Sequence, residues 1–349
     1  MKKIIRQTVG IDVSQKTLDV TFGQLDDLMD VSLFFQRSFK NDQEGFIKLL
    51  EMVVKIMDGS VPVRFVMEAT GVYHEKLAYF IHGEKHPLTI VLPNKISSFM
   101  RTLTIKTITD KTCSEAIARF GLERKLEDWN PPKVIYRSLR QLTRERDQLV
   151  EERTVIKNQL HAEKKEAYPF EKTIKRLLQR IAFLSKQEAD IKSDMESVIK
   201  NHNDVDGEIK YMTSIPGIGR LTAIILLAET NGFELIRNKK QLVSYAGLDV
   251  REKVSGTSVR GIARISKKGN TRLRKALYLP SITSIRWNEQ HTNVYARIVQ
   301  KHGIKKKGLV AIQRRLLELS FVLFKTKTYF DKEYEQKNSA QPKLDAIAD

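Results

Sequence analysis

Acidic side chains stand inside two stretches of this sequence that otherwise have the composition of buried strands. Asp12 lies within residues 9–13, Val-Gly-Ile-Asp-Val, and Glu68 directly follows the apolar residues 65–67. A carboxylate placed in an apolar strand costs several kcal/mol unless it is paired or bound to a cation. The pattern therefore favours a fold in which both strands bring their acids to a common place, and it predicts a shared divalent metal.

A third acid, Asp110, occupies the first turn of a helix expected over residues 110–122. At that position a carboxylate either caps the helix and is stabilised by its dipole, or joins Asp12 and Glu68 at the metal. Mg²⁺ prefers oxygen ligands, and phosphoryl transfer at paired metals needs several carboxylates around cations about 3.5–4 Å apart. Each acid alone is typical of a structural role, whereas the three together predict a Mg²⁺ site.

The charge balance favours nucleic acid as the partner. The chain has 61 Lys and Arg against 42 Asp and Glu, a formal net charge of +19. An excess of this size favours a polyanion, DNA first, with an anionic membrane surface as the competing interpretation. No segment reaches the roughly 18 apolar residues of a membrane span, and the N-terminus lacks the apolar region of a signal peptide. Cys113 is the only cysteine, which excludes a disulfide framework, so we expect a cytoplasmic protein without a membrane partner.

Short apolar strands alternate with amphipathic helices over residues 1–128. The expected strands lie in residues 8–23 (two strands around a polar turn), 63–67 and 88–92, where Pro93 ends the last of them. The expected helices lie at residues 43–57, 73–81 and 110–122. This order predicts an α/β N-terminal domain with a mixed sheet.

A boundary follows at residues 129–132, and the composition then changes to long polar helices over residues 133–205. Apolar residues there recur at spacings of three and four, and Pro169 interrupts the pattern. The pattern predicts a helical hairpin or two coiled-coil segments, which form either a structural arm or a dimerisation arm. Three charged residues occupy core-type positions and argue against a long, uniformly stable zipper: Arg146, Arg153 and Glu188.

Residues 206–330 are predicted to form a mostly α C-terminal domain. The run 214–219, Ser-Ile-Pro-Gly-Ile-Gly, precedes an apolar helix and is similar to a helix-hairpin-helix turn. Gly217 and Gly219 would let backbone N–H groups approach a phosphate, next to a helix N-terminus that attracts anions. An ordinary tight turn between helices is the alternative. The polar residues 331–349 are expected to form a disordered tail.

A basic segment, residues 250–275, contains nine Lys and Arg and the single acid Glu252. Basic residues mixed with glycine suit contact with a phosphate backbone, and a solvated basic face is the alternative. Ser255 precedes Gly256 there, but a serine is a weak nucleophile unless a base or a metal activates it, and most serines in such loops are turn residues. We expect nucleic-acid contacts from Gly217, Gly219, Arg260, Arg264, Lys267, Lys268, Arg272 and Arg274.

Several motifs together resemble those of the IS110 family of insertion-sequence transposases, also called DEDD transposases, and of the related Piv-type DNA invertases. They occur in the family order and cover nearly the whole chain. The motifs are Gly10-Ile11-Asp12-Val13, Met67-Glu68-Ala69-Thr70-Gly71, Thr109-Asp110-Lys111, Ile215-Pro216-Gly217-Ile218-Gly219, Tyr245-Ala246-Gly247-Leu248, Ser255-Gly256 and Arg264-Ile265-Ser266-Lys267-Lys268-Gly269-Asn270.

The resemblance implies a composite active site. A RuvC-like (RNase H-like) domain would hold Mg²⁺ with Asp12, Glu68 and Asp110, and a C-terminal transposase domain would supply Ser255. That serine would attack a DNA phosphodiester and form a phosphoserine link, after which strand exchange reseals the DNA. The resemblance also implies a guide RNA (a bridge RNA) transcribed from the element, and the helical arm favours a homodimer or tetramer. Ser258 is the second choice of nucleophile, because the loop has one extra residue relative to the family.

One position departs from the family pattern. The family reads Thr-Asp-x-x-Asp-Ala at its third and fourth acids, and here Cys113 stands at the fourth. A thiol is a soft, poor ligand for Mg²⁺. Glu115 lies two residues further on, about 200° around the helix. Either the site works with three acids, or Glu115 reaches it through a distorted helix start.

Two other functions remain open from the sequence. A RuvC-like nuclease would hydrolyse branched DNA with metal-activated water and would need no serine nucleophile. A nucleic-acid-binding protein without catalytic activity would use its acids for structure alone. A covalent protein–DNA adduct distinguishes the recombinase from the nuclease, and full recombination by an Asp12→Ala and Glu68→Ala double variant would support the protein without catalytic activity.

Overall fold

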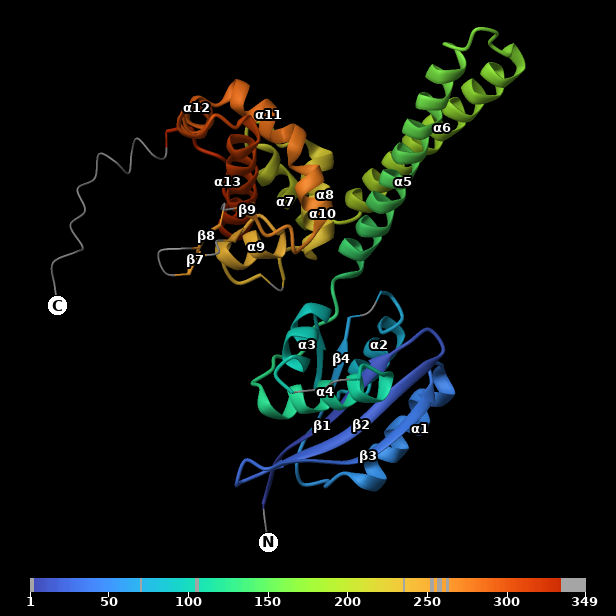
Figure 1. Cartoon of the computed structure of the whole chain (residues 1–349), viewed down its shortest axis with the longest axis vertical. Coiled ribbons are helices and arrows are strands. Elements are labelled where there is room, and N and C mark those ends of the chain that lie inside the picture. Colours follow the sequence, from blue (N-terminus) through green and yellow to red (C-terminus); the bar gives the residue numbers. More distant parts are fainter. Residues whose placement is uncertain are drawn as a thin grey trace, which may run out of the picture. The chain divides into compact units, whose positions relative to one another are not determined.

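The computed structural model describes residues 3–69, 71–103, 107–234, 236–251, 254–255, 259–261 and 264–333. The chain divides into two compact units, the first ending at Pro131 and the second beginning at Pro132 (Figure 1). Most of the predicted tail, residues 334–349, lies outside the described residues. Within the described part, no helix is long and apolar enough to cross a membrane.

The first unit is built on one five-stranded sheet in the order β3-β2-β1-β4-β5. Its strands are β1 Ile4–Val13, β2 Thr17–Asp26, β3 Val31–Lys40, β4 Val63–Glu68 and β5 Leu88–Val91. The first three pair antiparallel, whereas β4 is parallel to both β1 and β5. The predicted mixed sheet is thus confirmed. The sequence analysis missed β3, because this edge strand lacks alternation: Phe39 is its only buried residue.

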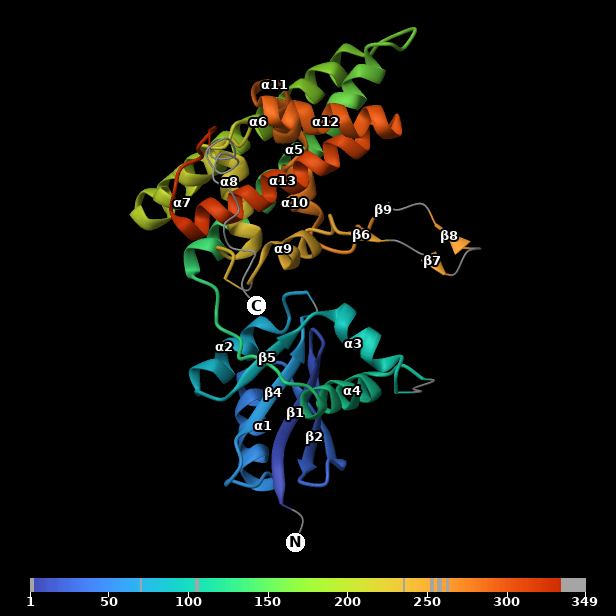
Figure 2. The same cartoon turned by 90° about the vertical axis from the view of Figure 1, so that its left-hand side faces the viewer.

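Helices cover both faces of this sheet (Figure 2). They are α1 Gln43–Ile56, α2 Glu75–Gly83, α3 Pro93–Met100 and α4 Asp110–Glu123. Val9, Ile11 and Val13 of β1 face a core shared with α1 and α2. The opposite face carries α4 at very close range, since a Cβ added to Gly10 would lie 2.2 Å from the Ala118 nitrogen.

Helix α3 corrects one sequence-based expectation. Pro93 was expected to end a strand, and it does follow β5, but it also opens a helix at its first position. Proline is favoured there because its missing N–H would have no partner inside the helix and its φ is already helical.

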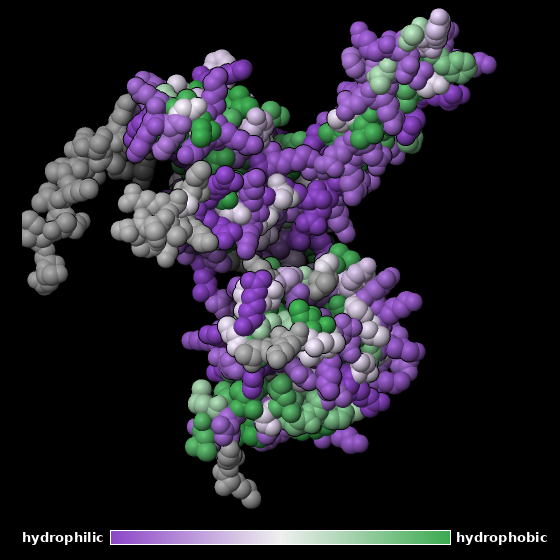
Figure 3. Space-filling view, viewed as in Figure 1, coloured by the Kyte–Doolittle hydropathy of each residue, from purple (hydrophilic) through white to green (hydrophobic). Residues whose placement is uncertain are grey.

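The second unit begins with an arm of two long helices, α5 Val134–Glu163 and α6 Glu171–Lys200. They pack along each other around Ile156, Leu177 and Leu184, and the chain reverses in the segment that contains Pro169, as predicted. The visible face of the arm is mainly hydrophilic (Figure 3). The hairpin is confirmed, whereas coiled-coil geometry stays a prediction.

The three charged residues at core-type positions of the arm pair with one another. Glu188 is 5% exposed and forms ion pairs with Arg146 at 3.0 Å and Arg153 at 2.6 Å, and with Lys192 at 2.9 Å. These partners hold the pKa of Glu188 down at about 2 although burial acts to raise it. The two helices therefore meet in a register that pairs their buried charges.

The remainder of the second unit is mostly helical. Its helices are α7 Asn203–Thr213, α8 Arg220–Thr230, α9 Lys239–Tyr245, α10 Thr271–Ala276, α11 Tyr278–Trp287, α12 Glu289–His302 and α13 Lys305–Thr326. They share one core with the base of the arm, including Ile135 and Leu139 of α5 and Met195 of α6. The division of this unit at residues 205 and 206 stays a prediction.

The basic segment is more ordered at its end than expected. Its described parts form two short antiparallel pairs, β6 Val250–Arg251 with β9 Arg264–Ile265, and β7 Val254–Ser255 with β8 Val259–Arg260. The last five residues, expected as loop, belong to α10, whose first backbone N–H groups are capped by the Asn270 side chain.

Candidate functional site

The three predicted acids come from neighbouring elements of the first unit. Asp12 is the penultimate residue of β1, and the parallel pairing of Ile11 with Met67 sets Glu68 of β4 beside it. Asp110 is the first residue of α4, which lies on the Gly10 face of β1, the face to which Asp12 also belongs. Sheet register and the close approach of α4 therefore bring the acids together.

Electrostatics show how near these carboxylates are to one another. Partial burial, together with the charges of Asp110, Glu68 and Asp19, raises the pKa of Asp12 to about 6. Like charges held together in a partly buried place favour a bound cation, and oxygen ligands are those that Mg²⁺ prefers. Among the described residues, however, no three His, Cys, Asp or Glu side chains surround one point closely enough to hold a metal ion. The cluster has the charge and donor chemistry of a Mg²⁺ site, while its ligand shell is not closed.

The sequence analysis missed Asp19, the fourth carboxylate of this cluster. Asp19 lies directly opposite Asp12 in the antiparallel pairing of β1 and β2, so both side chains share one face. The Ser38 hydroxyl of β3 donates a hydrogen bond to the Asp19 carboxylate. Counting the register of the hairpin back from its turn would have found this pair.

Cys113, which replaces the expected fourth acid, lies beside the same carboxylates. Burial, followed by the charges of Asp12, Glu68 and Asp110, raises the pKa of its thiol to about 11. The thiol is therefore neutral at physiological pH. Helix α4 begins regularly, with a capping box between Thr109 and Thr112, so the distorted start that would bring Glu115 inward is not observed.

Ser255 belongs to the second unit, in β7, where it pairs with Val259 of β8. Its side chain, and the whole of Ser258, lie outside what the structure describes. The meeting of this serine with the acids of the first unit stays a prediction.

The predicted helix-hairpin-helix glycines differ in their surroundings. Gly217 has a φ of +97°, and a Cβ there would lie 2.6 Å from the Pro280 carbonyl oxygen and 2.9 Å from Ser284. Its Cα therefore packs against α11, and its contact with a phosphate stays a prediction. Gly219 precedes the first residue of α8 and has no atom within 4 Å of an added Cβ, so that helix N-terminus is open to an anion.

The predicted basic contacts also fall into two groups. Arg264, Lys267 and Lys268 are exposed and have no carboxylate partner within the described parts of the chain. Arg272 lies 3.5 Å from the Asp147 carboxylate, and Arg274 donates to the Ala246 carbonyl oxygen at 2.7 Å. Both arginines are thus engaged within the fold, and their contact with nucleic acid stays a prediction. The Arg260 side chain lies outside the described residues.

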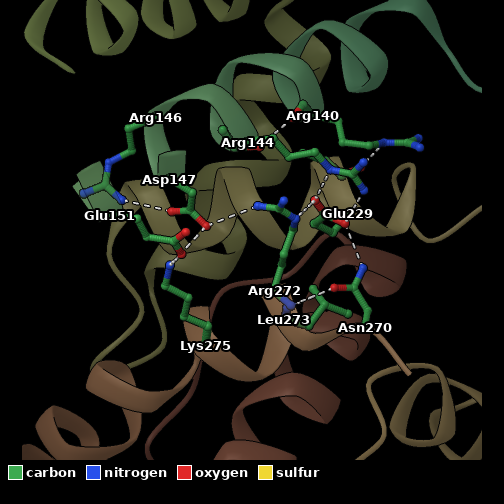
Figure 4. Close-up of polar contacts among 12 residues, drawn as sticks. Arg140, Arg144, Arg146, Asp147, Glu151, Glu229, Asn270, Arg272, Leu273 and Lys275 are labelled. Atoms are coloured by element: carbon green, nitrogen blue, oxygen red, sulfur yellow. Dashed lines mark hydrogen bonds and ion pairs between the residues drawn. The ribbon is translucent and has the colours of Figure 1, made fainter. Parts of the chain in front are cut away.

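A second buried carboxylate, Glu229 of α8, escaped the sequence analysis. Arg144 of α5 and Asn270 both donate hydrogen bonds to it, within a wider network of charged side chains (Figure 4). The signal that identified Asp12, an acid inside an apolar run, is present here too. Glu229 directly follows six consecutive apolar residues of α8, residues 223–228.

Two family models match the chain in the order that its motifs predicted. A model of DEDD transposases of the IS110 type, described as "Transposase", matches residues 9–169. A second, described as "Transposase IS116/IS110/IS902 family", matches residues 209–296. The chain belongs to the IS110 family of transposases. Members of this family are DNA-cleaving recombination enzymes, so the prediction of a DNA recombinase is confirmed at this level.

Individual relatives of this IS110-family chain align over much of its length. The pilin gene-inverting proteins of Moraxella lacunata and Moraxella bovis are each 28% identical over 325 residues, which covers 93% of this chain and 97% of theirs. The transposase for insertion sequence element IS1111A of Coxiella burnetii is 24% identical and covers 61% of this chain and 63% of its own.

Among solved structures, RuvC of T. thermophilus in complex with a Holliday junction aligns with 32% of this IS110-family chain and 90% of its own. The TM-score is 0.25 at 9% sequence identity. A similarity this low carries no argument, so the RuvC-like assignment of the first unit stays a prediction. The α/β first unit and the helical second unit are established by the fold itself.

Proposed function

We propose that this transposase cleaves and rejoins DNA with a Mg²⁺ site at Asp12, Glu68 and Asp110 and with Ser255 as its nucleophile. The observation that carries the proposal is the group of carboxylates around Asp12, brought together by sheet register and by α4, where partial burial and the charges of Asp110, Glu68 and Asp19 raise the pKa of that acid to about 6. A fold keeps such repulsion when the group has a use for it, and strongly perturbed acids cluster at functional sites.

The residues of the cluster have separate tasks in this proposal. Asp12, Glu68 and Asp110 would hold the cation, and Asp19 adds negative charge from the neighbouring strand. Bound Mg²⁺ would supply a positive charge next to the phosphate, where negative charge develops in the transition state. Cys113 contributes no charge, because its thiol is protonated at physiological pH.

The covalent step exchanges one phosphate ester for another. The Ser255 oxygen forms a bond to phosphorus, the bond to one deoxyribose oxygen breaks, and that oxygen leaves with the proton of the serine hydroxyl. The phosphoserine keeps the ester bond, so a second strand end can reverse the step and reseal the DNA without net hydrolysis. The name of the pilin gene-inverting relatives, which describes DNA rearrangement and not degradation, supports this class of reaction.

The partners follow from charge and from the family. Exposed Arg264, Lys267 and Lys268 would contact the phosphate backbone of DNA, and the open helix N-terminus after Gly219 would add another anion contact. A guide RNA encoded by the element, and a homodimer or tetramer formed through the arm, complete the proposal.

The decisive experiment traps the covalent intermediate. The full chain is incubated with Mg²⁺ and labelled DNA carrying the ends of its element, nicked so that the released strand diffuses away. We expect an adduct on a denaturing gel, and mass spectrometry of its peptides should place the DNA on Ser255. Ser258→Ala is the matched control and should still form the adduct, whereas Ser255→Ala should not.

Each other result has a definite meaning. Normal cleavage by Ser255→Ala would end the serine proposal and favour a nuclease that uses water. An adduct on Ser258 would move the nucleophile by three residues. For the guide RNA, sequencing of RNA that copurifies with the chain should return a transcript of the element, and cleavage should be lost after that RNA is removed.

A further inference from the structure

Glu229 is almost completely buried, yet it carries charge. Its exposed fraction is 3%, and its carboxylate accepts hydrogen bonds from Arg144 Nε at 2.9 Å and Arg144 Nη2 at 3.0 Å. A third hydrogen bond comes from Asn270 Nδ2 at 2.7 Å (Figure 4). Burial raises the pKa of Glu229, but these bonds more than offset that effect, so its pKa lies below the ordinary value.

The three partners come from three distant parts of the second unit. Arg144 belongs to α5 of the arm, Glu229 to α8, and Asn270 to the end of the basic segment that contains Ser255. A bidentate arginine–carboxylate pair fixes orientation as well as distance. We call Arg144, Glu229 and Asn270 the Glu229 clamp.

Asn270 is the residue of the clamp that belongs to the basic segment. Its side-chain oxygen accepts hydrogen bonds from the backbone N–H groups of Arg272 and Leu273 and so starts α10. Its own backbone N–H donates to the Tyr245 carbonyl oxygen at 2.8 Å, and the Tyr245 hydroxyl donates to the Glu229 carbonyl oxygen at 2.9 Å.

The base of the basic segment is tied to the same place. The backbone N–H of Ser266 donates to the Asp249 carbonyl oxygen at 2.8 Å, and that of Lys267 donates to the Gly247 carbonyl oxygen at 3.1 Å. Strands β6 and β9 continue this pairing toward Ser255. Each of these paired residues therefore lies within a few positions of Tyr245 or Asn270 in the sequence.

We propose that Glu229 is a positioning residue that fixes the base of the Ser255 segment to arm helix α5 through Asn270 and Arg144. A movement of α5 relative to α8 would pull on the bidentate pair and so displace the carboxylate that holds Asn270. The inference rests on the proposed function in one respect, because its effect on DNA cleavage requires that Ser255 be the nucleophile.

The test variant is Glu229→Gln in the full chain, which removes the charge and keeps the size of the side chain. Amide hydrogen exchange should become roughly 10-fold faster at Lys267, Asn270 and Arg272, whose backbone N–H groups the clamp protects. The rate of single-turnover DNA cleavage should fall roughly 10- to 100-fold, because small displacements of a nucleophile are costly. DNA affinity should change less than about 2-fold, since no exposed cation is altered.

Glu188→Gln is the matched control. It removes an equally buried carboxylate that also pairs with arginines of α5, but within the described residues Glu188 makes no direct contact with the clamp and is linked to it only through Arg146, Asp147 and Arg272. Its exchange at Lys267 to Arg272 and its cleavage rate should match those of the wild type. Arg144→Gln, at a side chain that is 45% exposed, provides a second variant if Glu229→Gln does not fold, and it should have the same effects on amide exchange and on the cleavage rate.

A reciprocal swap distinguishes the clamp from a general loss of stability. Asn270→Asp alone places two carboxylates against each other and should lower cleavage at least as much as Glu229→Gln. Combined with Glu229→Gln it restores one amide and one carboxylate at the same contact, so cleavage and amide protection should both recover in part. A double variant that is worse than either single variant would overturn the proposal.

The outcomes separate this inference from the proposed function. Unchanged exchange in Glu229→Gln overturns the clamp, whatever happens to cleavage. Faster exchange with normal cleavage also overturns the positioning role if Ser255→Ala is inactive. If Ser255→Ala cleaves normally as well, the serine assignment has failed and not the clamp.

Discussion

Carboxylates that are removed from solvent have opposite charged neighbours in the two units of this protein. In the first unit, Asp12 has other acids as its charged neighbours, and its pKa rises to about 6. In the second unit, Glu229 and Glu188 are surrounded by cations, and the pKa of Glu188 falls to about 2. Acids paired with cations join helices in the second unit, whereas the acids around Asp12 repel one another and favour a bound cation. This contrast identifies a binding site more reliably than burial alone.

Asp12→Asn should have the largest effect, because it should lower DNA cleavage and raise stability at the same time. Loss of a metal ligand should lower DNA cleavage by at least about 100-fold. The same change removes a repelled, partly buried charge, so the metal-free protein should become more stable by about 1–2 kcal/mol. Single-turnover cleavage and chemical denaturation without metal measure the two effects. A destabilised Asp12→Asn protein would show that the cluster is structural.

Glu188→Gln should instead lower stability and leave DNA cleavage unchanged. Removing one member of a buried charge cluster leaves Arg153 without its carboxylate partner and Arg146 with Asp147 alone, and breaking a buried pair in this way typically costs about 3 kcal/mol. Cleavage by the folded fraction should stay at the wild-type rate, because the arm cluster touches no predicted catalytic residue. Denaturation together with cleavage at low temperature tests this, and a folded variant with lost cleavage would contradict it.

His291 offers a third way of handling a buried ionisable group, which is to keep it neutral. It is 1% exposed, its Nδ1 lies 2.6 Å from the Ser284 hydroxyl, and burial followed by the charge of Arg315 lowers its pKa to about 4. The stability it contributes is complete above pH 6.5 and is lost as the pH falls toward 4, by at most about 3 kcal/mol. Denaturation of the wild type and of His291→Gln across this range should show the difference only in the wild type.

Cys113→Asp should sharpen the contrast within the first unit. A further acid beside Asp12 and Glu68 increases the repulsion, so the metal-free protein should lose about 1 kcal/mol of stability. Mg²⁺ should then raise the melting temperature more than it does in the wild type, because a carboxylate is the harder ligand. Cys113→Ser serves as the control and should leave both quantities nearly unchanged. An equal response to Mg²⁺ in both variants would place Cys113 outside the metal site.

Local patterns in the sequence were enough to locate the predicted acids on their elements. Asp12 and Glu68 stand out because each interrupts an apolar strand, and Asp110 because it opens a helix. Asp19 could not be seen in this way, because its role depends on hairpin register. Glu229 depends on Arg144, 85 residues away in the chain, and no local pattern reports such a partner.

The weakest predictions concerned residues whose surroundings are set by tertiary contacts. Gly217 has the sequence of a phosphate-binding turn but is enclosed by α11. Arg272 and Arg274 look like their neighbours in a basic run, yet their partners lie on α5 and in the turn after α9. Net charge predicts a polyanionic partner, whereas only the fold tells which cations are already engaged.

The smallest expected effect tests the distinction between exposed cations and cations that are engaged within the fold. Lys267→Gln combined with Lys268→Gln removes two exposed cations, so DNA binding should weaken and the slope of log Kd against log salt should fall by about 2. Arg272→Gln removes an engaged cation, so it should lower stability and leave the slope nearly unchanged. Titration of labelled duplex DNA at several salt concentrations measures both. A slope lowered by about 1 in Arg272→Gln would mean that the ion pair to Asp147 opens when DNA binds, and that the engaged and exposed cations form one surface.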